Sequence, residues 1–281
     1  MNRRGFLTGC LGGLASGWVS RRIAAEPSPR PIVVDAHVHA GYMGMWGQRE
    51  ISFEETLTAA DAAGIDKLCV SSTLSLTLDM KEGNQAVYEL MQRYPDRVIG
   101  FAALPSPYFG QQGLDEIRRA VEYYGMKGIG ELVTRPTYPA DLPGWTALLE
   151  TAADLHVPVL LHAVAGPCAR VAEAVPEATI LLAHMGAGNG IAPNEWSDAI
   201  EMAKLHPNVY LETAQSDTSY GQMELAVQEL GPERIVFGTD SPLLDPAVQK
   251  AKITGSDIDS KAKDLILGPN LARILDISPS L

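Results

Sequence analysis

The sequence predicts a single α/β domain that folds as a (β/α)8 barrel. Short runs of apolar and β-branched residues, typical of buried parallel strands, alternate along the chain with longer segments of helical spacing. Eight such units follow one another, and a barrel of this kind takes about 250 residues. A doubly wound open sheet is the alternative, but it would gather ligands at one switch point rather than around a ring of strand ends.

The boundaries of these units follow from the apolar runs and from the glycines that end the helical segments. The expected strands are residues 32–40, 67–72, 98–104, 126–133, 157–163, 179–184, 209–213 and 235–240. The expected helices are residues 53–63, 84–94, 114–124, 145–155, 169–174, 196–205, 223–230 and, after the last strand, 256–276. No change in composition marks a second domain, so one domain is expected over residues 32–281.

The composition disfavours several classes of protein. The chain has 281 residues, of which 46% are hydrophobic, and this is enough for a sizeable core. Its formal net charge of −12 disfavours a nucleic-acid partner, because the phosphate backbone is also negative. No apolar run after the N-terminal segment approaches membrane-spanning length, so stable membrane insertion is not expected. A small-molecule substrate is the expected partner, and assembly into a homo-oligomer stays open.

Residues 1–25 have the pattern of a signal peptide of the twin-arginine type. Arg3-Arg4 precede a weakly apolar, glycine-rich run, and Ala24-Ala25 offer small residues for cleavage. An uncleaved anchor or a disordered tail is the alternative. The proline-rich residues 26–31 form a linker. We therefore expect export to the periplasm or the extracellular space.

The first expected strand ends in two histidines, His37 and His39. Side chains alternate along a strand, so these two imidazoles lie on one face and can converge on one metal ion. The β-branched residues Val33 and Val34 favour a strand over a helix, which would separate the rings. Asp35 precedes the pair, and we expect it to form structural hydrogen bonds.

Glu131 ends the fourth expected strand, and three roles stay open for it. Its carboxylate could bridge a second metal ion, hydrogen-bond the substrate, or pair with Lys127 or Arg135.

Further candidate ligands stand at the ends of later strands, where a parallel barrel gathers its chemistry. His162 ends the fifth expected strand, His184 the sixth and Asp240 the eighth. Imidazoles together with a carboxylate suit Zn²⁺ or a similar divalent ion. The chain has six histidines, and the other two, His156 and His206, precede strands and are expected at the opposite rim in structural roles.

Strict two-residue alternation also assigns each candidate to one face of its strand. Each candidate ligand then occupies the last position of its face. The expected groups are Asp35, His37 and His39 on the first strand, Ile129 and Glu131 on the fourth, Leu160 and His162 on the fifth, and Leu182 and His184 on the sixth.

The cysteines add little to this picture. Cys10 belongs to the N-terminal segment, Cys69 lies in an expected strand, and Cys168 lies in a loop-like stretch. Two separate thiols are expected, although one disulfide is formally possible in an oxidising compartment.

Six segments, taken together and in order, resemble the metal-dependent amidohydrolase superfamily in its amidohydrolase-related (amidohydrolase 2) branch. The resemblance spans nearly the whole chain after the N-terminal segment. The segments are Val34-Asp-Ala-His-Val-His39, Met126-Lys-Gly-Ile129, Pro158-Val-Leu-Leu-His162, Leu182-Ala-His184, Phe237-Gly-Thr-Asp240 and the closing Ile266-Leu-Gly-Pro-Asn-Leu-Ala-Arg-Ile-Leu275.

The resemblance implies metal ligation by His37, His39, His162 and Asp240, with His184 placed near a water molecule that the metal activates. In two-metal relatives the strand-four residue bridges the ions, which makes Glu131 a further candidate ligand. The branch contains hydrolases of amides, lactones and esters, and also decarboxylases and hydratases. Many of its decarboxylases carry glutamate in place of the first histidine, so a histidine at position 37 favours hydrolysis.

These observations predict an exported hydrolase of a small carbonyl compound that depends on one or two divalent ions, with Zn²⁺ the expected metal. Asp240 is expected to accept a proton from the attacking water and to pass it to the leaving group, while His184 holds the water or polarises the carbonyl. The alternative is a metal-dependent decarboxylase of a small aromatic or enoic acid. A catalytically silent binding protein is a third hypothesis.

Overall fold

The computed structural model describes residues 30–42, 44, 49–105, 110–134, 143–187, 195–215 and 219–279. The expected signal peptide, 1–25, and residues 26–29 of the expected linker lie outside the described residues, so both stay predictions. Of the linker, Arg30 and Pro31 are described. Arg30 pairs with Asp66 at 2.6 Å and so fixes the start of the domain.

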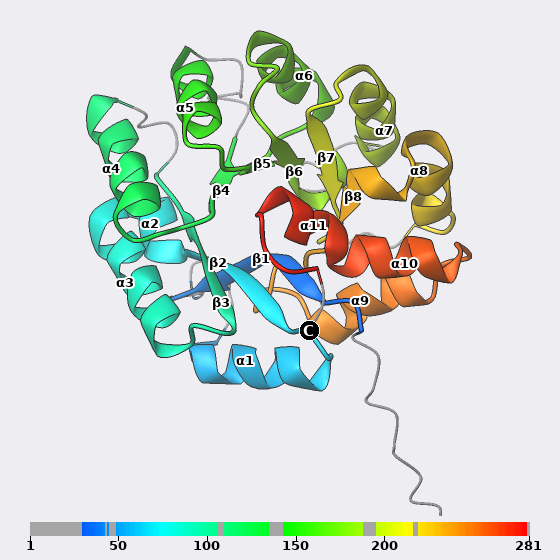
Figure 1. Cartoon of the computed structure of the whole chain (residues 1–281), viewed down its shortest axis with the longest axis horizontal. Coiled ribbons are helices and arrows are strands. Elements are labelled where there is room, and N and C mark those ends of the chain that lie inside the picture. Colours follow the sequence, from blue (N-terminus) through cyan, green and yellow to red (C-terminus); the bar gives the residue numbers. More distant parts are fainter. Residues whose placement is uncertain are drawn as a thin grey trace, which may run out of the picture.

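Eight parallel strands form the barrel and follow one another in the order of the sequence (Figure 1). The ring closes between its last and first members, because the N–H of Ala36 donates to the carbonyl of Phe237 at 2.9 Å and that of His39 to Ser241 at 2.7 Å. This arrangement confirms the predicted (β/α)8 barrel. The strands are β1 (Val34–Ala40), β2 (Lys67–Ser72), β3 (Val98–Ala102), β4 (Gly128–Val133), β5 (Val159–His162), β6 (Ile180–Leu182), β7 (Val209–Glu212) and β8 (Ile235–Val236).

Helices surround the strands on the outside of the barrel, except for the last one, which lies across one end of it (Figure 1). They are α1 (Phe53–Ala62), α2 (Thr73–Thr77), α3 (Met80–Arg93), α4 (Gln111–Glu122), α5 (Pro143–Asp154), α6 (Ala165–Ala174), α7 (Glu195–Leu205), α8 (Gln222–Leu230), α9 (Pro246–Thr254), α10 (Ser260–Leu267) and α11 (Pro269–Ile274).

Several helix boundaries differ from the prediction for local reasons. Helix α3 begins before residue 84 because the side chain of Asp79 caps it. Helix α9, which the sequence did not predict, has Asp245 as its cap and proline at its first position. The expected helix 256–276 is two helices, α10 and α11, since Gly268-Pro269 interrupts it. Cys168 lies in α6 rather than in a loop, and Cys69 and Cys168 are both buried, free thiols.

Alternate strand residues divide the apolar core into two parts. The larger part lies between the strands and the helices, and it includes Leu161 from β5 and Leu148 from α5. The smaller part fills the barrel itself, so the interior is packed and the chemistry is left to the open end. The smaller part includes Val34, Ala36, Cys69, Ile99, Phe101, Leu160, Leu181, Ala183 and Val236.

Helix α11 closes the barrel at the N-terminal ends of the strands (Figure 1). Its Leu271 and Leu275 belong to the same apolar cluster as Ile32. Asn270 donates from Nδ2 to the carbonyl of Ile235 at 2.8 Å. The opposite end, where the strands terminate, carries the predicted site residues. Among the described residues, no helix has the length and apolar character needed to cross a membrane.

Candidate metal centre

A bulge in β1 turns His37 and His39 into the mouth of the barrel. The pairing of β1 with β2 shifts register between Asp35 and Val38. Ala36 belongs to the barrel interior, whereas Val38 belongs to the core beneath the helices, so the two histidines on either side of Val38 point inward. The expected grouping of Asp35 with the histidines is therefore wrong, because the extra residue reverses the alternation.

Asp35 has the structural role that the sequence predicted. Its carboxylate accepts the N–H of His37 at 3.0 Å, the N–H of Thr239 at 2.9 Å and the hydroxyl of Thr239 at 2.5 Å. Burial raises the pKa of Asp35 to about 7, although these hydrogen bonds oppose the shift. The residue ties β1 to the segment that follows β8.

A second irregularity, in β4, aims Glu131 at the same mouth. The pairing of β4 with β5 shifts register between Ile129 and Leu132, and both of these side chains pack toward the helices. Glu131 therefore does not share the face of Ile129, as strict alternation predicted. Gly130 permits this path, since its φ is +112° and a Cβ there would lie 2.3 Å from the carbonyl oxygen of Leu160.

His162 follows the predicted alternation, but His184 does not. Leu160 points into the barrel and His162 ends β5 on the same face. Strand β6 already ends at Leu182, which packs outward. His184 and Met185 then have φ values of 57° and 51°, and this left-handed turn brings the His184 ring to the mouth. The expected strand end at residue 184 is wrong for this reason.

Asp240 is also held by left-handed backbone. Strand β8 ends at Val236 rather than at residue 240, and Asp240 has a φ of 57°. Its N–H donates to the carbonyl of His37 at 2.8 Å, which fixes the residue beside β1. Aspartate tolerates this conformation better than most residues do.

These side chains meet in one cluster with Glu131 at its centre. Oε1 of Glu131 lies 2.9 Å from Nδ1 of His162 and 3.0 Å from Nε2 of His184, and Oε2 lies 3.6 Å from Nε2 of His39. Oδ1 of Asp240 lies 3.2 Å from Nε2 of His39. Two donor groups share Glu131, and the donor atoms within each group lie within 4.8 Å of one another. The groups are His37, His39 and Glu131, and Glu131, His162 and His184.

The charges of the cluster favour a cation. Burial lowers the pKa of His37, but the carboxylates of Glu131, Glu212 and Asp240 outweigh burial and raise this pKa well above its ordinary value. Burial likewise raises the pKa of Glu131, but positive charge on His37 and His162 holds it well below its ordinary range. The cluster therefore stabilises positive charge at its ring nitrogens, whether protons or a metal ion supply it.

The donor set fits a divalent metal ion. Nε2 of His37 and Nε2 of His39 lie 3.2 Å apart, and two nitrogens on one tetrahedral Zn²⁺ lie about 3.3 Å apart. Nε2 of His162 and Oδ1 of Asp240 are buried and have no well-aligned hydrogen-bond partner. A cation at this position would satisfy these atoms.

Two supporting residues were missed by the sequence reasoning. Glu212, at the end of β7, is fully buried, and its Oε2 lies 3.0 Å from Nδ1 of His37. Ser71, in β2, places its hydroxyl 3.1 Å from Nδ1 of His39. The signal for Glu212 was an acidic residue at the end of an apolar strand, the same pattern that drew attention to Glu131.

His156 and His206 lie away from the cluster, each just before a strand, at the opposite rim as expected. His156 is exposed and belongs to the turn between α5 and β5.

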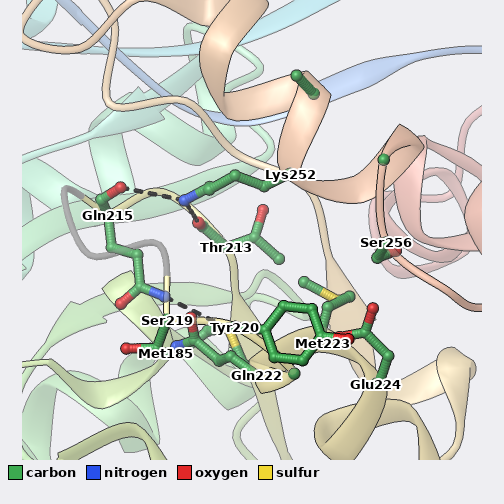
Figure 2. Close-up of a pocket in the computed structure, with 13 residues that line it drawn as sticks. Met185, Thr213, Gln215, Ser219, Tyr220, Gln222, Met223, Glu224, Lys252 and Ser256 are labelled. Atoms are coloured by element: carbon green, nitrogen blue, oxygen red, sulfur yellow. Dashed lines mark hydrogen bonds between the residues drawn. The ribbon is translucent and has the colours of Figure 1, made fainter.

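A cavity of about 270 Å³ lies beside α8 and α9, and no residue of the cluster lines it. Figure 2 shows Lys252 extending across it toward the segment that follows β7. Nζ of Lys252 donates to the carbonyls of Thr213 and Gln215 at 2.9 and 3.0 Å. These bonds hold the segment after β7 in place, and the cavity lies beside that segment rather than at the cluster.

Comparison with known proteins gives one family and a set of similar folds. A family model described as amidohydrolase matches residues 34–277. No curated protein matches the chain.

Three solved structures illustrate the shared fold. The 5-carboxyvanillate decarboxylase from Sphingomonas paucimobilis is 16% identical, with a TM-score of 0.68 over 89% of this chain and 99% of that one. A dihydroxybenzoic acid decarboxylase from Polaromonas with bound manganese is 17% identical, with a TM-score of 0.68 over 88% and 97%. The 4-oxalomesaconate hydratase from Rhodopseudomonas palustris is 18% identical, with a TM-score of 0.64 over 87% and 96%.

Proposed function

This chain belongs to the amidohydrolase family, and from that premise we propose that it is a metal-dependent hydrolase of a small carbonyl compound, either an amide, a lactone or an ester. Water adds across the bond between the carbonyl carbon and its leaving group. The carbon gains the hydroxyl, and the leaving group gains the proton. The reaction needs a site that activates both the water and the carbonyl, and a base that carries the proton between them.

The observation that carries this proposal is the position of Asp240, whose Oδ1 lies 3.2 Å from Nε2 of His39 and 3.7 Å from Nε2 of His37 at the mouth of the barrel. Burial would raise the pKa of Asp240, but positive charge on His37 and contact with His39 hold it below its ordinary range. The residue is thus a carboxylate at neutral pH, and its Oδ1 has no well-aligned hydrogen-bond donor. A carboxylate in this state can accept a proton from water and deliver it to the leaving group.

Two divalent ions would be held by the two donor groups that share Glu131. His37, His39 and Asp240 would hold one, and His162 with His184 the other. Bound there, the ions would polarise the carbonyl oxygen and lower the pKa of water. The manganese in one similar structure supports a divalent ion without favouring Zn²⁺ over Mn²⁺.

The orientation of His184 suits a role beside the reacting carbonyl. Its Nδ1 lies within hydrogen-bonding distance of the carbonyl oxygen of Ala214, and its backbone N–H donates to Oε2 of Glu212 at 3.2 Å. These two contacts fix the ring, and its Nε2 faces Glu131 at 3.0 Å. The ring is thus held where it would bind the second ion, beside the reacting carbonyl.

A second candidate function is a metal-dependent decarboxylase of a small aromatic or enoic acid. The names of the similar solved structures favour it, since two of the three are decarboxylases. Loss of CO₂ leaves a carbanion that must take up a proton, so this reaction calls for a proton donor rather than a carboxylate base. A histidine rather than a glutamate at position 37 supports hydrolysis instead.

One experiment separates the two reactions. The protein, loaded with Zn²⁺ or Mn²⁺, is given a panel of lactones, esters and amides and a panel of hydroxybenzoic and enoic acids. Acid or amine release from the first panel, with no CO₂ from the second, is the expected result. Release of CO₂ without any hydrolysis would overturn the proposal in favour of the decarboxylase.

A further inference from the structure

We infer that Glu212 is a positioning residue that makes Nε2 of His37 the metal-binding atom and holds the His184 turn at the correct distance. The inference rests on one part of the proposed function, namely that the cluster binds a metal ion. It adds β7, which carries none of the predicted ligands, as the strand that orients the ligands of β1 and β6.

The contacts of Glu212 use both of its oxygens. Oε2 lies 3.0 Å from Nδ1 of His37 and accepts the backbone N–H of His184 at 3.2 Å. Oε1 accepts the backbone N–H of Ala214 at 2.6 Å. A carboxylate accepts only, so the Nδ1 of His37 must carry the proton in this contact. The lone pair of that ring then lies on Nε2, which faces the cluster.

The same strand end also orients the second histidine. The carbonyl oxygen of Ala214 lies within hydrogen-bonding distance of Nδ1 of His184, so this ring too has its Nε2 directed at the cluster. Because Glu212 binds the backbone N–H of both Ala214 and His184, it holds the acceptor and the turn that carries the ring. The carboxylate of Glu212 thus contacts one histidine from each donor group, His37 and His184.

The segment after β8 leaves room for this carboxylate. A Cβ on Gly238 would lie 2.0 Å from Oε1 of Glu212 and 2.9 Å from Cβ of His37. Any side chain at position 238 would therefore press on both Glu212 and His37. Gly238 offers a way to displace the carboxylate without changing its charge.

Glutamine cannot replace Glu212 without loss. Each oxygen of Glu212 faces at least one N–H group, and an amide has only one oxygen. Its NH₂ would face an N–H, which leaves a buried donor without an acceptor. Loss of such an outer partner of a metal-binding histidine typically weakens metal affinity by about 10–100-fold.

The test compares Zn²⁺ affinity, measured by competition with a chromophoric chelator, in the wild type and three variants of the full chain. Glu212→Gln removes the acceptor, and Gly238→Ala displaces it. Glu116→Gln is the matched control, because Glu116 is also buried and accepts hydrogen bonds from Asn84 and Arg119, neither of which belongs to the cluster. The absorption spectrum of the Co²⁺-loaded protein serves as a second readout.

The expected result is a loss of about 10–100-fold in affinity in Glu212→Gln and Gly238→Ala, with an altered Co²⁺ spectrum, and an affinity within about threefold of wild type in Glu116→Gln. Wild-type affinity in a folded Glu212→Gln protein would overturn the inference and leave the proposed function standing. If Glu212→Gln does not fold, wild-type affinity in Gly238→Ala overturns it. Failure of the wild type to bind any metal would overturn both.

Discussion

Glu131 and His162 meet across β4 and β5, with Oε1 of the carboxylate 2.9 Å from Nδ1 of the ring. The same oxygen lies 3.0 Å from Nε2 of His184, and the other oxygen faces His39 at 3.6 Å. One carboxylate therefore stands between two groups of donors. This relationship underlies the proposal that the mouth of the barrel holds two ions.

Replacing His162 separates the two groups. His162→Ala removes a donor from the group that contains His184 and leaves His37, His39 and Asp240 untouched. We expect the metal content, measured by mass spectrometry, to fall from about two equivalents to about one, because Glu131 and His184 alone fall short of the three protein ligands typical of a catalytic Zn²⁺ site. Retention of two equivalents, or loss of both, would contradict the division into two groups.

Replacing the base tests its role in proton transfer. Asp240→Asn keeps the size of the side chain, and asparagine also tolerates the left-handed backbone at this position. We expect kcat to fall by about 10²–10⁴-fold with little change in thermal stability, because the amide cannot accept the proton. The measurement is steady-state kinetics beside a thermal melt. A kcat equal to that of the wild type would remove Asp240 from the mechanism.

Metal affinity should depend on pH. The pKa of His37 is raised because, despite burial, nearby carboxylates favour its charged form, and the pKa of His184 is raised as well. Protons therefore occupy these rings at a higher pH than in free histidine and compete with the metal through the neutral range. We expect affinity to fall by about tenfold per pH unit for each proton displaced as the pH drops from 8 to 6. Chelator competition at several pH values checks this, and a flat profile would be the contrary result.

Two glycine substitutions test whether the irregularity in β4 directs Glu131 to the mouth of the barrel. Gly130→Ala places a Cβ 2.3 Å from the carbonyl oxygen of Leu160, so we expect a loss of about 1–3 kcal/mol in the free energy of unfolding and weaker metal binding. Gly125→Ala is the control, since its φ of +75° is also left-handed but nothing lies within 4 Å of the added atom. Urea unfolding and metal titration give the two readouts. Equal effects in both variants would mean that Gly130 does not aim Glu131.

The barrel could be predicted because its signals are local and repeated. The apolar run at 67–72 became β2 with the same bounds, and Val98 and Val209 begin strands as expected. Short strands were harder to bound. Strand β6 ends at Leu182, just before the left-handed turn at His184, and β8 ends at Val236, four residues before the left-handed Asp240. Alternating hydrophobicity does not reveal such turns.

The sequence indicated which residue types form the candidate site, but it did not reliably indicate which way their side chains point. Strict alternation aimed His162 correctly, since β5 is regular. It wrongly grouped Asp35 with His37 and His39, and it failed for Glu131 and His184, because bulges in β1 and β4 and a left-handed turn after β6 change which way these side chains point. Glu212 ends an apolar strand as Glu131 does, but it was missed because its contact with Nδ1 of His37 joins residues 175 positions apart, and no local pattern reveals that contact.

The central claim is that the side chains at the mouth of the barrel hold a divalent metal ion, and metal analysis of the purified protein tests it most directly. The wild type, stripped with chelator and reloaded with Zn²⁺, is compared with His39→Ala and with His156→Asn, which alters an exposed histidine of the opposite rim. The account predicts tightly held zinc in the wild type and in His156→Asn, and a clear loss in His39→Ala. Zinc held equally by all three proteins, or by none, would contradict it.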